Sequence, residues 1–429
     1  MSTGSTSTFL DELRWRGFLE ASTSEDLDEY LNEARRTMYV GFDPTADSLH
    51  LGSLIPVMAL AHAQRHGHRP LVLVGGGTGL IGDPSGKSAE RTLLTKEKAE
   101  ENASAIGRQL SRFFDLSSED RGLVRNNADW LVSLNLVDFL RDVGKFFSVN
   151  EMIKRDSVRT RLEERDHGIS FTEFSYMLLQ AYDFLHLCSE CDCTIQMGGS
   201  DQWGNILSGA DLIRRMLRTR AEGITFPLLT TSTGKKFGKT EEGAVWLDAK
   251  RTSPYKLYQY WLQTADADAV RYLKLFTFLD RSRIEELARE VETDPARREA
   301  QRVLAAECTA ILHGEDSVRA VEAASRILFS ASNEVPSAET IEMLAAEMPF
   351  TTISPADLDQ KIGLVDLLVR TKLAESKGAA RKLIEGGGVY LNNNRENQPT
   401  KAISPADLEW PNAVLLRAGK KNYHLVLVQ

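Results

Sequence analysis

The chain has 429 residues, 42% of them hydrophobic and 26% charged, with a formal net charge of −9. This is a globular composition, and the length allows two or three domains. No run of about 18 apolar residues is present, so no membrane span is expected. The N-terminal residues have no apolar signal core and carry Asp11 and Glu12, so a cytoplasmic location is expected.

The first candidate site is the stretch YVGFDPTADSLHLGS, residues 39–53. After a helical segment over residues 1–36, it is predicted to be a strand, a turn and then a helix that Asp47 or Ser48 would cap. A helix start of this kind offers backbone N–H groups to a phosphate, and His50 and Gly52 stand where that ligand would lie. Pro56 is expected to kink the helix, because it cannot donate a hydrogen bond.

A glycine-rich turn follows the predicted buried strand Leu71–Val74. Gly77, Gly79 and Gly82 match the spacing of a dinucleotide fingerprint, but that motif should open a helix and here a turn with Asp83 follows. The GKS triplet at residues 86–88 lacks the earlier glycine that a P-loop needs. The remaining interpretation is that this turn forms a wall of a nucleotide site.

The middle of the chain places three polar residues on one helix face. Residues 96–146 are predicted to be helical with a strand at 123–126, and the charged segment 148–176 follows. In the next helix Tyr176, Gln180 and Asp183 stand at i, i+4 and i+7. Such a face is costly to bury unless it binds something, and a partly exposed helix is the alternative.

Two further segments complete the set of candidate motifs. A strand at 194–197 runs into glycines that allow a ribose close approach, with an aspartate to accept its hydroxyls. Arg214 and Arg215 lie on the next helix, where they form either a basic binding cluster or a solvated face. The loop KKFGKT, residues 235–240, carries lysines that can follow a departing pyrophosphate; an ordinary lysine-rich hairpin is the alternative.

The C-terminal part differs in charge from the rest. Residues 251–350 are predicted to be mostly helical, and 349–355 reads as a proline-bearing linker. Residues 361–429 contain eleven basic and six acidic residues, which gives this segment a net charge of +5 and leaves −14 for residues 1–360. This asymmetry suggests nucleic acid. The tail is predicted to contain a helix, a glycine cap, a strand and a turn.

Three of the four cysteines lie in CSECDC, residues 188–193. They could act as zinc ligands with His186 nearby, but reduced cysteines without a metal are the simpler interpretation. No metal site is therefore assigned.

Taken in order, these motifs resemble those of the class I aminoacyl-tRNA synthetases, in the form found in bacterial tyrosyl-tRNA synthetases. HLGS resembles the HIGH signature, KFGKT resembles the KMSKS loop, and GGSDQWGN matches the family's form closely. The tail resembles the small S-four-type RNA-binding module. The resemblance implies an α/β fold with a Rossmann-type parallel sheet, a helical anticodon-side domain and a small α+β domain. The implied bounds are 1–250 with a connective insert, 251–350 and 361–429.

The resemblance also implies residue roles. Tyrosine would be held by Tyr39, Asp83, Tyr176, Gln180, Asp183 and Gln196. ATP would be held by Gly41, Asp43, Thr45, His50, Gly52, Gly198, Gly199, Asp201, Gln202, Lys236, Phe237, Gly238 and Lys239. Catalytic charge stabilisation would fall to His50, Lys87, Arg91, Lys236, Lys239 and Thr240. tRNA would contact Arg214, Arg215, Arg381 and Lys382.

The implied reaction has two steps. Tyrosine and ATP, with Mg²⁺, give tyrosyl-adenylate and pyrophosphate, and tyrosine then passes to the 3′-terminal adenosine of tRNA(Tyr). The family also implies a homodimer, for which the apolar segment 131–149 is a candidate surface. Two alternatives stay open. A tryptophanyl enzyme should lack the polar pair Tyr39 and Asp183, and a non-catalytic RNA-binding paralogue should lose His50 or the loop lysines.

Overall fold

The computed structural model describes residues 7–85, 94–163, 168–234, 237–240, 243–329, 335–408, 410–419 and 422–429. The chain divides into two compact units. The first consists of Met1–Thr252 and Gln263–Leu304, and the second of Ser253–Leu262 and Ala305–Gln429.

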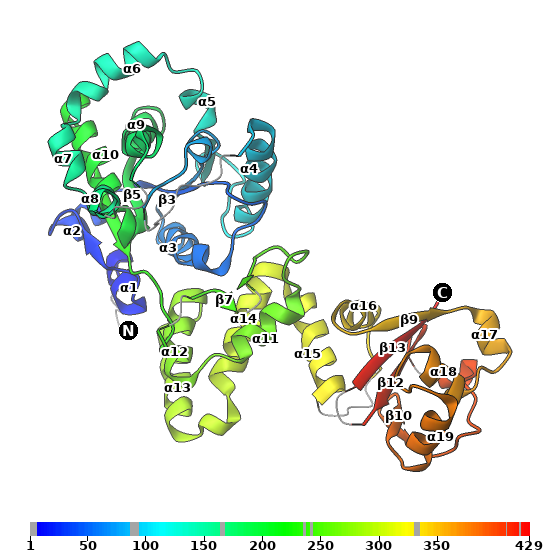
Figure 1. Ribbon diagram of the computed structural model, residues 1–429. Helices are drawn as coiled ribbons and strands as arrows, with labels where there is room; N and C mark the ends of the chain where they lie inside the picture. The colour runs from blue at the N-terminus through cyan, green and yellow to red at the C-terminus, as the bar shows by residue number, and fades with distance from the viewer. Residues whose placement is uncertain are drawn as a thin grey trace. The chain divides into compact units, whose positions relative to one another are not determined.

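The first unit, in which Figure 1 labels β3 and β5, is built on a six-stranded sheet. The strand order of this sheet is β1-β6-β5-β2-β3-β4. β1 pairs antiparallel with β6, and every other neighbouring pair is parallel. The strands are β1 (Ala21–Ser22), β2 (Thr37–Phe42), β3 (Arg69–Val74), β4 (Leu123–Asn126), β5 (Cys193–Gly199) and β6 (Glu222–Phe226). The chain winds from β2 through β3 to β4 and then continues on the other side with β5 and β6. The carboxyl ends of β2 and β5 therefore flank the switch point where open α/β sheets bind ligands.

Helices precede, connect and follow these strands. They are α1 (Phe9–Arg16), α2 (Leu27–Glu33), α3 (Leu54–Arg65), α4 (Lys96–Leu110), α5 (Ala128–Leu131), α6 (Leu136–Asp142), α7 (Val149–Ile153), α8 (Asp156–Glu163), α9 (Phe171–Cys191), α10 (Trp203–Met216), α12 (Asp266–Phe276) and α13 (Arg281–Thr293). Short 3₁₀ turns are η1 (Leu51–Ser53), η2 (Thr78–Leu80), η3 (Gly144–Phe146), η4 (Ser200–Gln202) and η5 (Pro295–Arg297). A two-stranded hairpin joins β7 (Lys239–Thr240) to β8 (Gly243–Ala244).

Alternation along the strands separates the two faces of this sheet. Tyr39 of β2 and Leu71 of β3 share a buried cluster with Phe184 of α9. Their neighbours Val40 and Val72 point to the opposite face, where α3 packs on β2 and β3. Tyr39 thus points toward the helix that carries the predicted polar face.

Three local predictions for the N-terminal part are wrong. Residues 1–36 are not one helical segment, since α1 ends at Gly17 with φ +85° and β1 joins the edge of the sheet. Neither Asp47 nor Ser48 caps the next helix, which begins after His50 without a side-chain cap. The predicted kink at Pro56 is wrong, because Pro56 lies in the first turn of α3, where a backbone N–H would have no acceptor within the helix. The lack of an N–H therefore breaks no helical hydrogen bond, and α3 continues to Arg65.

The second unit combines helices with a five-stranded sheet in the order β11-β10-β12-β13-β9. The helices are α11 (Pro254–Leu262), α15 (Glu315–Phe329), α16 (Ala338–Glu347), α17 (Pro355–Asp359), α18 (Leu364–Arg370) and α19 (Lys377–Glu385), with η6 (Pro405–Asp407) and the second half of α14 (Glu299–His313). The strands are β9 (Phe350–Ile353), β10 (Val389–Leu391), β11 (Asn394–Glu396), β12 (Ala413–Ala418) and β13 (Asn422–Val428). The predicted order of helix, glycines, strand and turn in the tail is confirmed.

The predicted linker at 349–355 is wrong, because its centre is β9, which pairs in parallel with β13. A second cluster joins Ile327 of α15 and Leu344 of α16 to Trp410 and Leu425. The prolines suggest a break in the chain, but Pro349 and Pro355 only flank a strand at the sheet edge. No helix in the described part of the chain is long and apolar enough to cross a membrane.

Candidate functional site

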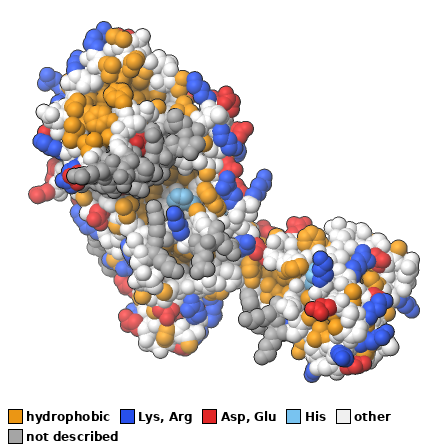
Figure 2. All heavy atoms as spheres, in the orientation of Figure 1, with side chains coloured by type: hydrophobic (Ala, Val, Ile, Leu, Met, Phe, Trp, Pro, Cys, Tyr) orange, Lys and Arg blue, Asp and Glu red, His pale blue; other side chains and the backbone are white. Residues whose placement is uncertain are grey.

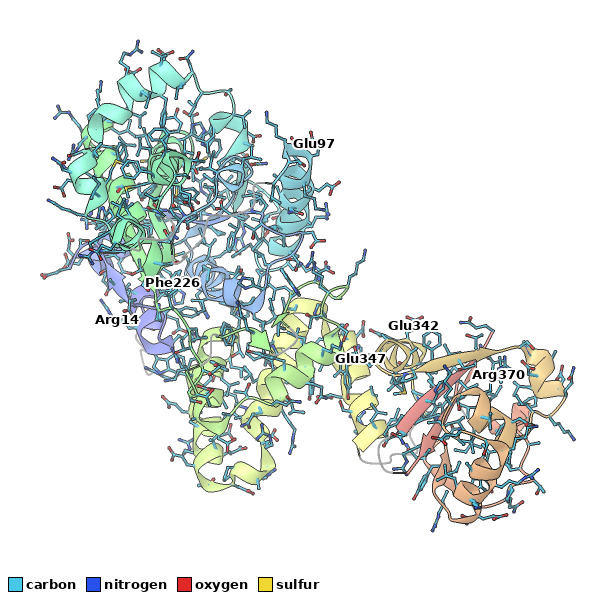
Figure 3. All side chains as sticks on the ribbon, viewed as in Figure 1. Arg14, Glu97, Phe226, Glu342, Glu347 and Arg370 are labelled. Atoms are coloured by element: carbon cyan, nitrogen blue, oxygen red, sulfur yellow. The ribbon has the colours of Figure 1, made fainter. Side chains whose placement is uncertain are left out.

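A cavity of about 690 Å³ opens at the carboxyl ends of β2, β3, β5 and β6 in the first unit. It lies at the switch point of the sheet, where ligand sites of this architecture form. Phe226, the last residue of β6, is part of its wall (Figure 3). The cavity wall includes Tyr39, Gly41, Asp43, Thr45, His50, Gly52, Asp83, Tyr176, Gln180, Asp183, Gln196, Gly198, Gly199, Asp201, Gln202 and Phe237, all of which the sequence had singled out.

The Asp183 carboxylate is a deeply buried polar group of the cavity lining, at 1% exposed. Asn127 Nδ2 donates to Oδ2 at 2.7 Å, and Trp130 Nε1 donates to Oδ1 at 2.8 Å. Burial raises the pKa of Asp183 to about 8, although these two hydrogen bonds favour the ionised form. A carboxylate held by two donors still has lone pairs for a third, so it can accept from a ligand hydroxyl.

The Tyr39 hydroxyl faces the same region and has no hydrogen-bond partner among the described residues. Tyr39 is 1% exposed, and burial together with the charge of Asp183 raises its pKa well above the usual value. An unpaired buried hydroxyl is costly, so its occurrence in a cavity wall indicates a partner supplied by a ligand. The hydroxyl of Tyr39 can donate or accept one hydrogen bond and the carboxylate of Asp183 can accept another, so the two groups are chemically suited to a ligand hydroxyl.

A chain of hydrogen bonds links Asp183 to the turn after β2. Asn127 Nδ2 also donates to Thr78 Oγ1 at 2.9 Å, and Thr78 Oγ1 donates to Asp43 Oδ1 at 2.8 Å. Tyr176 Oη donates to Asp43 Oδ2 at 3.0 Å. Asp43, expected on the ATP side, is therefore also connected to the residues expected around tyrosine.

A second polar group of side chains surrounds Asp83. Gln202 Nε2 donates to Asp83 Oδ2 at 2.7 Å, and Gln180 Nε2 donates to Gln202 Oε1 at 3.1 Å. Asn205 Nδ2 donates to Gln180 Oε1 at 2.9 Å. Gln196 Oε1 is buried without a partner among the described residues. These acceptors, with the two carboxylates of Asp43 and Asp83, suit an ammonium group.

The HLGS segment is held in place by the chain that follows the β7–β8 hairpin. Leu51 N donates to Val245 O at 2.9 Å, and the His50 ring lies 6.2 Å from the Trp246 ring. A Cβ on Gly52 would lie 2.8 Å from His50 Cε1, so glycine is required for the imidazole to take this position. His50 is exposed at the cavity wall, as a group that meets a nucleotide should be.

The end of β5 and the turn after it bring Gly198, Gly199 and Asp201 to the cavity. A Cβ on Gly199 would lie 2.6 Å from Asp201 Oδ1. The backbone and this carboxylate thus approach each other closely, and substitution at Gly199 would disturb the aspartate expected at the ribose.

The loop residues are only partly described. Lys87, Arg91 and Lys236 lie outside the described residues. Phe237 and Gly238 are buried, while Lys239 is exposed in β7. The backbone of Thr240 pairs with Gly243. Lys239 and Thr240 form β7 of the hairpin and Gly238 directly precedes it, and none of the three lines the cavity.

The residues expected to contact tRNA lie in both units. Arg214 and Arg215, in the last turn of α10, both pair with Asp211, at 2.5 Å and 2.7 Å. Arg381 and Lys382 are exposed on α19 in the second unit. The cysteines Cys188, Cys191 and Cys193 are buried and free, and no metal-binding cluster is found among the residues that the structure describes.

Sequence reasoning missed four residues of the site: Thr78, Asn127, Trp130 and Asn205. A signal for two of them was present, because Thr78 and Asn127 follow predicted parallel strands, and polar residues at strand carboxyl ends converge at a switch point. Trp130 bonds to Asp183 and Asn205 bonds to Gln180, and both partners are distant in the sequence. These two contacts become apparent only in the folded structure.

The chain matches two family models. Residues 31–330 match "tRNA synthetases class I (W and Y)", and residues 340–426 match "Tyrosine--tRNA ligase SYY-like C-terminal domain". A tyrosine–tRNA ligase from Roseiflexus castenholzii is 50% identical over 421 residues, which cover 98% of this chain and 99% of that protein. One from Staphylococcus carnosus is 46% identical over 423 residues, again 98% and 99%. The chain belongs to the tyrosine–tRNA ligase family.

Solved structures agree with this membership in a class I aminoacyl-tRNA synthetase family. A C-terminally truncated mitochondrial tyrosyl-tRNA synthetase of Aspergillus nidulans has a TM-score of 0.69 and 34% identity, covering 76% of this chain and 95% of that one. A tryptophanyl-tRNA synthetase of Encephalitozoon cuniculi shares the fold at a TM-score of 0.54 and 16% identity, covering 72% and 87%. The recognition, fold class and enzyme class inferred from the sequence are confirmed.

Proposed function

We propose that this tyrosine–tRNA ligase binds tyrosine with its phenol between Tyr39 and Asp183. The observation that carries this proposal is the buried Tyr39 hydroxyl, which has no partner among the described residues. Tyr39 lines the same cavity as Asp183, whose carboxylate is fixed by Asn127 and Trp130. A tyrosine phenol can donate to Asp183 and accept from Tyr39, which satisfies both groups. Phenylalanine would leave both unpaired, and tryptophan offers only a donor.

The amino group of tyrosine is placed at the opposite end, near Asp83, Tyr176 and Gln180. Gln202 and Asn205 already fix the amide of Gln180 and one oxygen of Asp83. An ammonium can donate to three acceptors, which this group supplies. The tyrosine carboxylate would then point toward the HLGS segment, and Gln196 completes the pocket wall.

ATP would occupy the part of the cavity between the turn after β2 and the turn after β5. Gly41, Thr45, His50 and Gly52 stand on one side, and Gly198, Gly199 and Asp201 on the other. Asp201 would accept from the ribose hydroxyls. Mg²⁺ would enter with ATP as part of the substrate, held by phosphate oxygens and water.

In the first step the tyrosine carboxylate attacks the α-phosphate in line and pyrophosphate leaves. Charge spreads over the phosphate oxygens, so orientation and positive charge lower the barrier without a protein nucleophile. His50 and Lys239 supply donors in this proposal, with Lys87, Arg91, Lys236 and the Thr240 hydroxyl assigned from the sequence. In the second step a ribose hydroxyl of the terminal adenosine attacks the tyrosyl carbonyl, and AMP leaves.

Single-turnover formation of tyrosyl-adenylate tests these roles. His50→Ala should lower the rate by about 10²–10³, the usual range for losing one transition-state donor, with tyrosine affinity nearly unchanged. Asp248→Asn is a matched control, because Asp248 is a nearby acid that does not line the cavity. Unchanged chemistry with weaker tyrosine binding in His50→Ala would refute the assignment.

The tail is proposed to bind tRNA, with the catalytic domain over 1–250, the helical domain over 251–350 and the RNA-binding domain in the tail. Lys and Arg side chains spread over the visible face of the second unit support this (Figure 2). Arg381 and Lys382 are exposed on α19, whereas Arg370 forms an ion pair with Asp357 at 3.4 Å. Phosphate contacts of this kind weaken steeply with salt. Arg214 and Arg215 are proposed to meet the acceptor end.

A homodimer is proposed through the surface of α6 and its neighbours. Within the candidate segment Phe139, Phe146 and Phe147 pack inward, while Leu136 and Val137 are 68% and 72% exposed. Figure 2 shows hydrophobic side chains gathered on this part of the first unit. An exposed apolar patch is typical of an interface, and a monomer mass in light scattering at micromolar concentration would refute the dimer.

A cytoplasmic location is also proposed, in keeping with four free, buried cysteines.

A further inference from the structure

The loop that precedes β7 is bonded to the first turn of α12. Asp268, which is 5% exposed, accepts from the Ser232 N–H at 3.0 Å with each carboxylate oxygen, and Ser232 Oγ donates to Oδ2 at 2.8 Å. An acid in a first helical turn often bonds to its own helix, yet α12 has no side-chain cap bond. The Asp268 carboxylate instead accepts its hydrogen bonds from Ser232 in the loop.

The same face of α12 holds a second residue of this loop. Asp268, Tyr272 and Phe276 follow each other at intervals of four, so they form one stripe. The Phe237 ring stacks on Phe276 at 5.0 Å and 6° and lies 5.1 Å from the Tyr272 ring. Phe237 is 4% exposed, so the aromatic contact is fully formed.

The other side of the loop is attached to the HLGS segment. Val245 N donates to Gly238 O, and Leu51 N donates to Val245 O, both at 2.9 Å. Gly238 has φ +76°, and a Cβ there would lie 3.2 Å from Gly52 N. The backbone that leads into Lys239 is thus held between α12 and the residues next to His50.

We propose that Asp268 is a positioning residue for adenylate formation. It fixes Ser232 on the face of α12 that also holds Phe237, two residues before Lys239, and so helps to set the direction in which Lys239 approaches the triphosphate. A charge-assisted hydrogen bond to a backbone N–H is about twice as strong as a neutral one. Small displacements of a charged donor cost a large share of its effect on the transition state. This inference rests on the proposed role of the loop in the first step.

The test uses the full chain and single-turnover formation of tyrosyl-adenylate with saturating substrates. Asp268→Ala should lower the rate by about tenfold to 100-fold and Ser232→Ala, which keeps the N–H bonds, by about two- to fivefold. Tyrosine affinity should stay within about twofold of wild type, because Asp268 lies outside the tyrosine pocket. Trypsin should also cleave after Lys239 faster in Asp268→Ala.

Asp280→Ala is the matched control, since Asp280 caps α13 in the same unit by accepting from Arg283 N at 2.8 Å and does not touch the loop. A wild-type rate in folded Asp268→Ala and Ser232→Ala, or an equal loss in Asp280→Ala, would overturn the inference. Lys239→Ala separates the proposed function of the loop from the proposed positioning role of Asp268. If it keeps the wild-type rate, the proposed loop function fails; if it is slow while Asp268→Ala is not, only the positioning role fails.

Discussion

Replacing Tyr39 by phenylalanine should stabilise the free protein and weaken its choice of substrate. The Tyr39 hydroxyl is buried without a partner among the described residues, and such a group costs about 1–3 kcal/mol. Removing it should therefore raise the free energy of unfolding by about 1 kcal/mol or more when no tyrosine is present. When tyrosine is bound, the wild-type hydroxyl gains a hydrogen bond that the variant cannot make.

The expected effect on specificity follows from that bond. A neutral hydrogen bond contributes about 0.5–1.5 kcal/mol, so preference for tyrosine over phenylalanine should fall by about two- to 13-fold. Tyrosyl-tRNA synthetases are themselves the standard example of such discrimination, at about 10⁵, so most of it should survive in Tyr39→Phe.

Urea unfolding with and without tyrosine, together with pyrophosphate exchange for both amino acids, measures the two effects. Tyr176→Phe is the contrasting control, because its hydroxyl donates to Asp43 at 3.0 Å and its loss should destabilise the free protein. If Tyr39→Phe were less stable than wild type without ligand, and its discrimination unchanged, the hydroxyl would have another role.

Three further results are expected. Since the pKa of Asp183 is raised to about 8, tyrosine affinity should increase from pH 6 to pH 8 as the carboxylate ionises, then level off, and calorimetry of Asp183→Asn should show no such rise. Burial lowers the pKa of His68 to about 4, and its Nδ1 accepts from Arg36 N. Because the unfolded chain binds the proton more readily, the free energy of unfolding should fall by about 2 kcal/mol between pH 7 and pH 5. This fall should be smaller in His68→Phe. Arg381→Glu with Lys382→Glu should leave pyrophosphate exchange intact while tRNA charging falls and its salt dependence flattens, and full charging by that variant would contradict the tRNA role of α19.

The start of the C-terminal tail is a place where sequence reasoning failed, because the predicted linker at 349–355 would have allowed the tail to be removed cleanly. A cut after Pro355 would remove β13, the partner of β9, and would expose the faces of α15 and α16 that pack on Trp410 and Leu425. The prolines indicate a break because their effect on the local backbone can be deduced from the sequence. The pairing of β9 with β13, which joins Phe350 to Leu425, cannot be deduced in this way. Charge reversal on α19 leaves this core intact.

The residues of the site were predictable where they are related by a short, regular spacing in the sequence. Tyr176, Gln180 and Asp183 share a helix face by simple periodicity, and the turns after β2 and β5 reach one cavity because parallel strands end at the same edge. Trp130 and Asn127, which hold Asp183, come from a different strand-to-helix connection and had no periodic signal of their own. The cap predicted at Asp47 or Ser48 failed because tertiary contacts take those side chains: Asp47 pairs with Arg251, and Ser48 bonds to Gln109.

Amino-acid-dependent ATP–pyrophosphate exchange tests the central claim most directly, with tyrosine, phenylalanine and tryptophan compared on wild type and Asp183→Asn. The phenol site of Tyr39 and Asp183 predicts fast exchange with tyrosine only, and a strong loss of that exchange in Asp183→Asn with the exchange for phenylalanine little changed. Comparable wild-type exchange with phenylalanine or tryptophan, or an Asp183→Asn variant that activates tyrosine as wild type does, would contradict it.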